Sequence, residues 1–401
     1  MANAVITGMG ILSPIGNNLN EVTQSLKTGK SGISKNQEYK ELGMKSTISG
    51  SISIDLSEII ERKILRFMSK ASAFAYIAAK EAILCSGIEL DKIDLTRVGV
   101  VAGSGGASPE AQIIASDTAR NKNPKRIGPY AVTKTMGSTV SASLGTFFKT
   151  QGVNYSISSA CSTSAHCIGH AAQLIESGLQ DVIIAGGGED DHWTSSSLFD
   201  AMGALSSKYN EEPERASRPF DTSRDGFVIA AGAGIVIIED EAHAKSRGAN
   251  IIASLKGYAA NSDGYDMVAP SGEGAKRCMK KALQQVKNVD YINAHGTGTL
   301  LGDVAELQAI KDTFDSHIPI ITSTKSLTGH SLGAAGAQEA IYSLLMMKNN
   351  FISPSINIDE VITEGKGLSI NKDYLEKEIR TVMSNSFGFG GTNASLVFTK
   401  Y

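Results

Sequence analysis

The sequence predicts an α/β protein in which helices cover layered β-sheets. Short runs rich in β-branched residues alternate along the chain with longer runs of small, helix-forming residues, which is the pattern of that class. Glycine is abundant, with 41 residues concentrated in the loops between these runs. A chain of 401 residues, 41% of them hydrophobic, is long enough for one large or two ordinary domains with buried cores.

The individual elements follow from this alternation. The predicted strands are β-branched runs that stop at glycine or polar residues, and the predicted helices are longer runs with apolar residues at helical spacing. In chain order, strands are expected at residues 4–7, 98–102, 154–158, 182–185, 235–239, 251–258, 291–293, 320–323 and 395–398, and helices at 69–86, 130–148, 161–177, 274–286, 303–314 and 334–347.

A seam between two halves is predicted near residues 239–250, where a strand ends in a polar, charged helix and a new strand begins. Each side of the seam opens with a strand that runs into glycine, at Gly8 and at Gly257, which is a faint hint of duplication. The expected division is therefore 1–250 and 251–401.

Composition excludes several function classes. The net charge of −3 lacks the basic excess of a general nucleic-acid binder. Four cysteines without a CxxC pair predict neither a disulfide framework nor a zinc site, which fits a reducing compartment. The first residues lack a signal-peptide pattern, and no apolar run approaches the roughly 20 residues of a membrane helix. A cytoplasmic protein that binds neither nucleic acid nor membrane is expected.

The most informative residue is Cys161, in the run Ser-Ser-Ala-Cys-Ser-Thr-Ser-Ala-His. It lies where a β-branched stretch gives way to a helical pattern, so the positive end of the helix dipole should point at the sulfur. This favours the thiolate over the thiol, against a free-cysteine pKa of about 8.5. Cys85 and Cys278 lie in helical runs and have the pattern of structural cysteines.

Two histidines follow in Gly/Thr-rich loops after predicted strands. His295 begins the run His-Gly-Thr-Gly-Thr, and His330 lies in Lys-Ser-Leu-Thr-Gly-His-Ser-Leu-Gly. Strand ends are where α/β folds place their sites, so both histidines are candidate functional groups. Near the C-terminus, the loop around Phe389 in Gly-Phe-Gly-Gly-Thr-Asn can aim backbone N–H groups at an oxyanion. No GxxxxGK[ST] or proper GxGxxG motif predicts a nucleotide site.

One cysteine and two histidines admit two chemistries. In a cysteine protease a histidine deprotonates the thiol, and the 134 residues from Cys161 to His295 match a papain-like interval, although the local cysteine signature is absent. In carbon–carbon bond formation the thiolate carries an acyl group while a second thioester loses CO₂. Two neutral imidazoles on one thioester oxygen would stabilise that enolate, each donor contributing about 2.7–4 kcal/mol. A β-carboxy thioester is its own electron sink, so this chemistry needs no cofactor.

These motifs together resemble the β-ketoacyl-[acyl-carrier-protein] synthases, and the similarity covers essentially the whole chain. The run 225–228 (Asp-Gly-Phe-Val) and the run 267–271 (Met-Val-Ala-Pro-Ser) share it. The resemblance implies a thiolase-like fold of two similar βαβαβαββ halves in five α/β layers, the first half carrying the cysteine with dimer and cap insertions. It also implies a homodimer that elongates fatty acyl chains by decarboxylative Claisen condensation of acyl and malonyl groups held on the phosphopantetheine of acyl carrier protein.

The resemblance further implies a role for individual residues. Cys161 would be acylated, with the Cys161 and Phe389 N–H groups as its oxyanion hole, while His295 and His330 hold the malonyl thioester. Lys325 would support His330 electrostatically. Asp303 and Glu306 would be partners of Lys325. The residues implied at the substrate are Thr297, Thr299, Gly106 and Phe387, and those at a possible cation are Asn293, Glu339, Ser384 and Asn385. The residues implied at the carrier-protein surface are Arg62, Lys63, Arg66, Lys122, Lys125 and Arg126.

Three functions remain open at this point. The decarboxylating condensing enzyme is favoured, and the glycine at 106, bulky in type II synthases, favours type I over type II. A thiolase or cysteine hydrolase is the enzymatic alternative, but thiolases use a second cysteine late in the chain and no cysteine follows Cys278. A catalytically inactive partner subunit would lack the nucleophile that Cys161 supplies.

Overall fold

The computed structural model describes residues 3–314 and 317–401. Its ten main strands form one continuous sheet with the order β10-β9-β13-β14-β8-β1-β7-β6-β4-β5. The first half runs β1 (Ala4–Leu12), α5 (Lys70–Ser86), β4 (Val98–Gly103), α8 (Thr139–Phe148), β5 (Asn154–Tyr155), α9 (Thr163–Glu176), β6 (Val182–Glu189) and β7 (Gly232–Asp240). The second half runs β8 (Ala253–Ser262), α12 (Glu273–Ala282), β9 (Tyr291–Asn293), α13 (Leu300–Thr313), β10 (Ile320–Thr322), α15 (Ala335–Asn349), β13 (Thr381–Gly388) and β14 (Thr392–Lys400).

The two halves repeat one βαβαβαββ pattern. In the first, β5, β4 and β6 are parallel, and β7 lies antiparallel between β6 and β1. In the second, β10, β9 and β13 are parallel, and β14 lies antiparallel between β13 and β8. Within residues 3–314 and 317–401, strands β1 and β8 join the halves through two residue pairs, Val5 with Ser254 and Ile6 with Ala253. The predicted duplication is therefore present in the topology.

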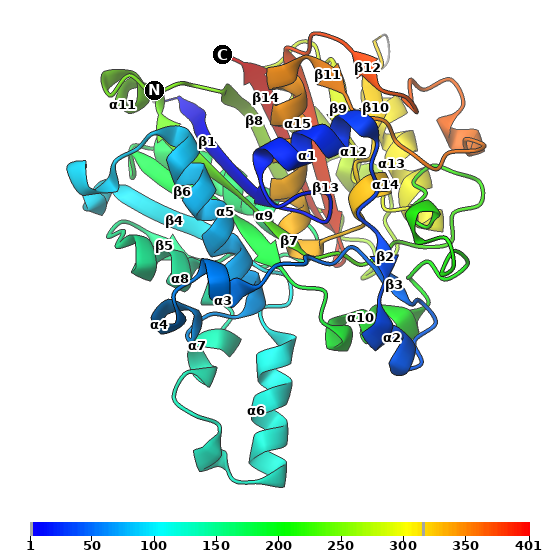
Figure 1. Ribbon diagram of the computed structural model, residues 1–401. Coiled ribbons are helices and arrows are strands. Elements are labelled where there is room, and N and C mark those ends of the chain that lie inside the picture. Colours follow the sequence, from blue (N-terminus) through cyan, green and yellow to red (C-terminus); the bar gives the residue numbers. More distant parts are fainter. Residues whose placement is uncertain (1–2, 315–316) are drawn as a thin grey trace.

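The elements stack in five layers (Figure 1). Helices α5 and α8 cover the outer face of the first half-sheet, α9 and α15 lie between the two half-sheets, and α12 covers the outer face of the second together with α13. Because α15 is enclosed, it is buried from Ala335 to Met347 without a polar face. The fold class and layering predicted from the sequence are confirmed.

Glycine allows the outer helix to lie very close to β1. A Cβ atom on Gly8 or Gly10 would overlap the backbone oxygen of Ala82 or Ala78 on α5. The glycines in Ile-Thr-Gly-Met-Gly therefore serve helix packing in this half.

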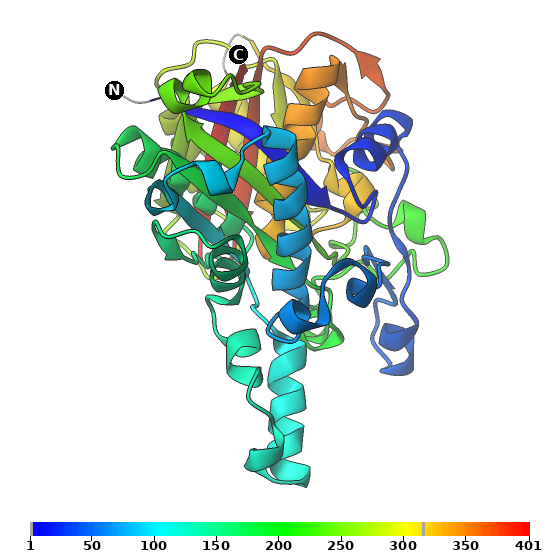
Figure 2. The same cartoon turned by 60° about the vertical axis from the view of Figure 1, so that its left-hand side comes forward.

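Some predicted boundaries were wrong. The helix expected at 130–148 is broken into α7 (Ala131–Thr135) and α8, because Met136 is extended, with φ −62° and ψ 142°. The helix expected from Asp303 begins earlier, at Leu300. Strand β13 and helix α6 (Pro109–Asn121) were not predicted. Figures 1 and 2 show α6 projecting from the body, and neither α6 nor α7 has a buried residue.

None of the helices in residues 3–314 and 317–401 combines the length and apolarity of a membrane span.

Shorter elements complete the described chain. The remaining elements are α1 (Leu19–Thr28), β2 (Ser34–Lys35), α2 (Gln37–Glu41), β3 (Ile48–Ser49), α3 (Leu56–Ile59), α4 (Arg62–Leu65), η1 (Leu90–Lys92), η2 (Leu95–Arg97), η3 (Pro124–Arg126), α10 (Trp193–Met202), η4 (Pro213–Arg215), α11 (Glu241–Ser246), α14 (Lys325–Thr328), η5 (Leu332–Ala334), β11 (Phe351–Ile352), η6 (Thr363–Gly365) and β12 (Leu375–Glu376).

Candidate active site

Cys161 lies in a tight turn between β5 and the start of α9, as the sequence predicts. The preceding residue, Ala160, has φ +50°, a left-handed conformation that costs an alanine energy and persists only where neighbours enforce it. Thr163 supplies that support, because its Oγ1 donates to the Ala160 oxygen at 2.8 Å and accepts the Ser159 N–H at 2.8 Å. The turn holds the sulfur at the N-terminal end of α9.

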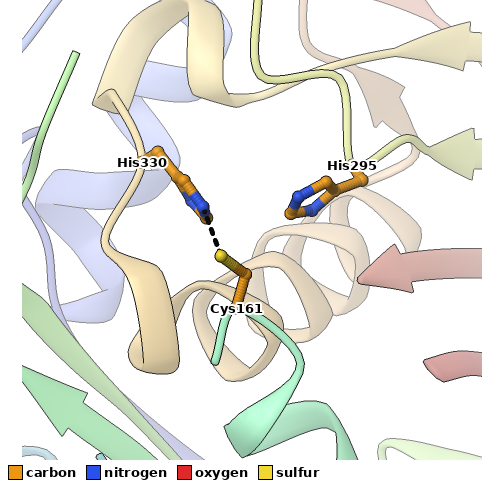
Figure 3. Close-up of side chains that lie close together, drawn as sticks. All are labelled: Cys161, His295 and His330. Atoms are coloured by element: carbon orange, nitrogen blue, oxygen red, sulfur yellow. Dashed lines mark hydrogen bonds between the residues drawn. The ribbon is translucent and has the colours of Figure 1, made fainter. Parts of the chain in front are cut away.

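The two halves of the chain bring both histidines to this sulfur (Figure 3). His295 follows β9, and His330 follows α14. The Nε2 atom of His330 lies 3.1 Å from the Sγ atom of Cys161, and the two imidazole rings meet edge to face with centroids 5.2 Å apart. One ligand atom from each of the three residues lies within 4.8 Å of the others. The convergence expected from two strand-end loops is present.

Burial dominates the charge state of this cluster. It raises the pKa of the Cys161 thiol to about 11, although the positive charge of Lys325 and the Phe389 N–H act in the opposite direction. The expectation that the helix N-terminus makes Cys161 a resting thiolate is therefore wrong, because desolvation of the sulfur outweighs it. Burial, and then the charge of Lys325, lower the pKa values of His295 and His330 well below 6.5. Both imidazoles are neutral at pH 7.

The Lys325 side chain contacts His295. Its Nζ atom donates to the backbone oxygen of His295 at 2.6 Å and lies 3.4 Å from His295 Nδ1. An ammonium group has no acceptor, so Nδ1 must offer its lone pair and the ring proton sits on Nε2. Lys325 thus fixes the tautomer of His295, while on His330 it acts through its charge, which lowers the pKa of that imidazole.

The carboxylate in direct contact with Lys325 is not one of the two expected partners, Asp303 and Glu306. Glu339, on α15, forms a buried ion pair with it. Asp303 and Glu306, on α13, instead bind the backbone of the His295 loop. Glu306 accepts the His295 and Gly296 N–H groups at 2.8 and 2.7 Å, and Asp303 accepts the Gly298 N–H at 3.0 Å. Burial raises the pKa of Glu306 to about 7 and that of Asp303 to about 6. These carboxyl groups position the loop rather than neutralise the lysine.

The glycine loop between β13 and β14 closes over the nucleophile. A Cβ atom on Gly388 would lie 3.0 Å from the Cys161 nitrogen, and the Phe389 N–H points at the Cys161 sulfur. Ser162, directly after the nucleophile, contacts both ends of this loop. Its hydroxyl oxygen lies 2.9 Å from the backbone oxygen of Ser386 and 2.8 Å from that of Thr392. Two backbone N–H groups are thereby held beside one sulfur, which is the arrangement of an oxyanion hole.

A cavity of about 410 Å³ opens onto the cluster. Apolar residues form most of its wall, while Thr297 and Thr299 offer hydroxyl groups 3.1 Å apart. The ring of Phe387 meets that of His295 at a centroid distance of 6.0 Å. The predicted site residues on the cavity wall are Cys161, His295, Thr297, Thr299, Glu306, His330, Phe387 and Phe389.

Gly106 lies outside this cavity wall, on an exposed loop that a buried carboxylate holds. Glu189, at the end of β6, accepts the Gly105 and Gly106 N–H groups at 2.6 and 3.1 Å, and also the Gly333 N–H at 3.0 Å. It thereby joins the loop of Gly106 to the loop that follows His330. Burial raises the pKa of Glu189 to about 7. Sequence reasoning missed this residue, because its only signal is an acidic side chain after an apolar strand.

The residues expected to surround a cation lie close together near Lys325. Asn293 donates to Thr324 Oγ1 at 3.1 Å, and Asn385 accepts the Ser395 hydroxyl at 2.8 Å. Glu339 Oε2 and Ser384 Oγ are buried and have no hydrogen-bond partner within the described residues. Two unpaired oxygens are compatible with a small cation, which is also bound by oxygen ligands.

The predicted basic surface does not form a single patch on this chain. Arg62, Lys63 and Arg66 are exposed on α4 and its C-cap, and the Arg66 guanidinium lies over the rings of Phe67 and Tyr130, 5.0 Å from each centroid. The second group lies beyond α6, at the far end of the projecting arm (Figure 2). That group consists of Lys122, Lys125 and Arg126.

Comparisons with known proteins agree along the whole chain. Residues 1–244 match the model of the Beta-ketoacyl synthase N-terminal domain, and residues 252–359 match that of the C-terminal domain. The 3-oxoacyl-[acyl-carrier-protein] synthase 1 of Haemophilus influenzae is 56% identical over the full length of both chains. The Escherichia coli K12 protein of the same name is 55% identical over 100% of this chain and 99% of its own. A synthase 2 from Coxiella burnetii is 39% identical over 99% and 98% of the two chains.

Solved structures are similar as well. A beta-ketoacyl synthase from Burkholderia phymatum superposes with a TM-score of 0.94 at 33% identity, covering both chains completely. A ketosynthase bound to the hexaketide, solved with its type II polyketide acyl-carrier protein, superposes with a TM-score of 0.89 at 31% identity over 100% of this chain and 99% of the other.

Proposed function

This chain belongs to the β-ketoacyl synthase family, and from that premise we propose that it is a type I 3-oxoacyl-[acyl-carrier-protein] synthase. It elongates fatty acyl chains by decarboxylative Claisen condensation of an acyl group with a malonyl group, both delivered on acyl carrier protein. The observation that carries the proposal is the meeting of one thiol and two neutral imidazoles on the wall of one cavity. Organic cofactors have no part in this reaction.

The first step transfers the acyl group. As the Cys161 sulfur attacks the thioester carbon, its proton passes to His330 Nε2, which lies 3.1 Å away. The Cys161 and Phe389 N–H groups bind the developing oxyanion. The bond from the acyl carbon to the carrier sulfur then breaks, and the departing carrier thiolate takes the proton back from His330. The products are acyl-Cys161 and free carrier thiol.

The second step releases CO₂ from the malonyl group. Once Cys161 is acylated it has no S–H to donate, so His330 can hold its proton on Nε2, because Nδ1 has no partner within the described residues. His295 carries its proton on Nε2 already, since Lys325 lies against Nδ1. Both N–H groups donate to the thioester oxygen, the carbon–carboxylate bond breaks, and the electron pair becomes an enolate.

The third step forms the carbon–carbon bond. The enolate carbon attacks the acyl carbon on Cys161, and the same two backbone N–H groups bind the oxyanion. The bond to the Cys161 sulfur then breaks, and the thiolate takes a proton from solvent. The product is a 3-oxoacyl thioester, longer by two carbons, on the carrier protein.

Relatives of both types support the type I assignment. Identity is 55–56% to proteins named synthase 1 and 39% to one named synthase 2. Gly106 supports it indirectly, since a Cβ atom there would make only ordinary contacts, the nearest 3.5 Å from Glu189. A bulky side chain therefore fits the loop, and glycine leaves that space open for acyl chains.

The partner is acyl carrier protein, and the assembly is a homodimer. A solved relative is described as a ketosynthase with its acyl-carrier protein. Strand β5 ends the sheet with an open edge, and the arm of α6 and α7 exposes Ile114 and Val132 at 60% and 73% of their surfaces. A second copy would cover both features. The six basic residues offer charge complementarity to an acidic carrier.

Two structural assignments belong to the same proposal. The boundary between the halves lies near residue 250, which agrees with the gap between the two matched domains at 244 and 252. A small cation lies among Asn293, Glu339, Ser384 and Asn385, where it would satisfy the unpaired oxygens of Glu339 and Ser384.

The proposal is tested by incubating the purified chain with acyl- and malonyl-carrier protein and weighing the products. A 3-oxoacyl-carrier protein, with one CO₂ released per product, is expected. A 3-oxoacyl product made from two acyl groups, with the malonyl-carrier protein unconsumed and no CO₂ released, would indicate a thiolase, and free acid would indicate a hydrolase. Inert substrates would indicate a catalytically inactive partner subunit.

A further inference from the structure

The catalytic cluster has the composition and spacing of a metal site. Tetrahedral zinc binds sulfur at about 2.3 Å and nitrogen at about 2.0–2.1 Å, which sets its ligand atoms about 3.3–3.6 Å apart. The His330 Nε2 and Cys161 Sγ atoms are 3.1 Å apart, and one atom of His295 lies within 4.8 Å of both. No other trio of histidine, cysteine or acidic residues in the described chain has such spacing. All three residues line the cavity.

One residue opposes metal binding at this cluster. Zinc needs a lone pair on an imidazole nitrogen, but Nε2 of His295 carries the ring proton and the lone pair of Nδ1 is directed at the Lys325 ammonium, 3.4 Å away. To bind zinc, His295 would have to move that proton to Nδ1, directly against the ammonium group. The positive charge also repels the cation itself. His330 has no such obstacle, since its Nδ1 is free of partners within the described residues.

We propose that Lys325 is a specificity-determining residue that excludes zinc-type divalent cations from the Cys161, His295 and His330 cluster. Without its charge, Zn²⁺ binds the Cys161 thiolate and both Nε2 atoms, the thiol proton is released to solvent, and the nucleophile is blocked. The inference depends on the geometry of the cluster and holds whatever reaction the chain catalyses.

The test compares metal binding in the wild type and in Lys325→Met. Because the substitution leaves Glu339 buried without its partner, the double variant Lys325→Met/Glu339→Gln is measured beside it. Lys276→Met, which removes another ion-paired lysine outside the cluster, is the matched control. Zn²⁺ is titrated by equilibrium dialysis, and Co²⁺ replaces it to report sulfur coordination through a thiolate-to-cobalt charge-transfer band. Circular dichroism verifies the fold.

At least tenfold tighter binding of one Zn²⁺ per chain is expected in both Lys325 variants, with the cobalt band present there and absent from the wild type and Lys276→Met. Adding Cys161→Ser should abolish the band, whereas adding Cys85→Ser should leave it. Equal affinities in wild type and variants, or a band that survives Cys161→Ser, would overturn the proposal. The wild-type measurement is decisive by itself if the variants do not fold, since one tightly bound zinc per wild-type chain contradicts exclusion.

Discussion

The imidazole of His330 contacts the thiol of Cys161 across 169 residues of sequence, with 3.1 Å between Nε2 and Sγ. His295 approaches the same sulfur from the other side but is bound to Lys325 through Nδ1. The two histidines are therefore unequal: one is placed to accept the thiol proton, and the other is fixed as a donor.

This inequality predicts different effects of the two alanine variants on acyl transfer. His330→Ala should slow acylation of Cys161 by about 100-fold, in the range of lost general-base catalysis, because the thiol pKa of about 11 leaves little thiolate at pH 7. His295→Ala should slow it less than tenfold. Transfer of a radiolabelled acyl group to the protein measures both rates. Equal losses in the two variants would contradict the division, while condensation should fall by orders of magnitude in each.

Gly106→Met should shorten the acyl chains that the enzyme accepts. The added side chain would fill the open space next to Glu189 and Ser195, which would then be closed to the end of a long acyl chain. Short acyl groups should still react, which serves as the internal control. Chain-length profiles of the products measure the effect, and unchanged turnover of long chains would return Gly106 to the role of a turn residue.

Replacing Arg62, Lys63 and Arg66 with Glu should raise KM strongly for acyl-carrier substrates and little for small pantetheine thioesters. Charge attraction acts on the acidic carrier protein and weakens as salt reduces the Debye length below about 10 Å. The wild type should lose carrier affinity with salt more steeply than the variant. The same substitutions at Lys122, Lys125 and Arg126 form the comparison on the arm. Identical salt slopes for wild type and the first variant would place carrier docking elsewhere.

The buried carboxyl group of Glu189 should make the stability of the fold depend on pH. Its pKa is about 7 in the folded chain against 4.5 in the unfolded one, so folding binds a proton between these values. The contribution of this group to the free energy of unfolding is therefore complete below pH 4.5 and is lost as the pH rises to 7. The loss is at most about 3 kcal/mol, since one pKa unit corresponds to about 1.36 kcal/mol. Glu189→Gln should flatten this slope in unfolding titrations at pH 5 and 7.5. A slope unchanged by the substitution would assign the proton to another group.

The sequence predicted the parts of this molecule that depend on local pattern. Apolar runs identified strands such as 291–293, and strand-end loops identified His295 and His330, because elements of an α/β fold bring such loops to a common edge. Burial and long-range pairing were not predictable. The raised pKa of Cys161 depends on desolvation by residues from both halves, and the pairing of Lys325 with Glu339 depends on how α14 meets α15. Glu189 acts through backbone N–H groups, which carry no sequence signal.

The central claim is that the histidines release CO₂ from malonyl thioester independently of the nucleophile, and Cys161→Gln tests it most directly. The glutamine amide imitates an acyl thioester in the oxyanion hole of Cys161 and Phe389, so the variant should take up no acyl group and still release CO₂ from malonyl-carrier protein. Cys161→Ala should retain a lower rate, and adding His295→Ala to either should suppress it. Absence of CO₂ release from both folded single variants would contradict the account.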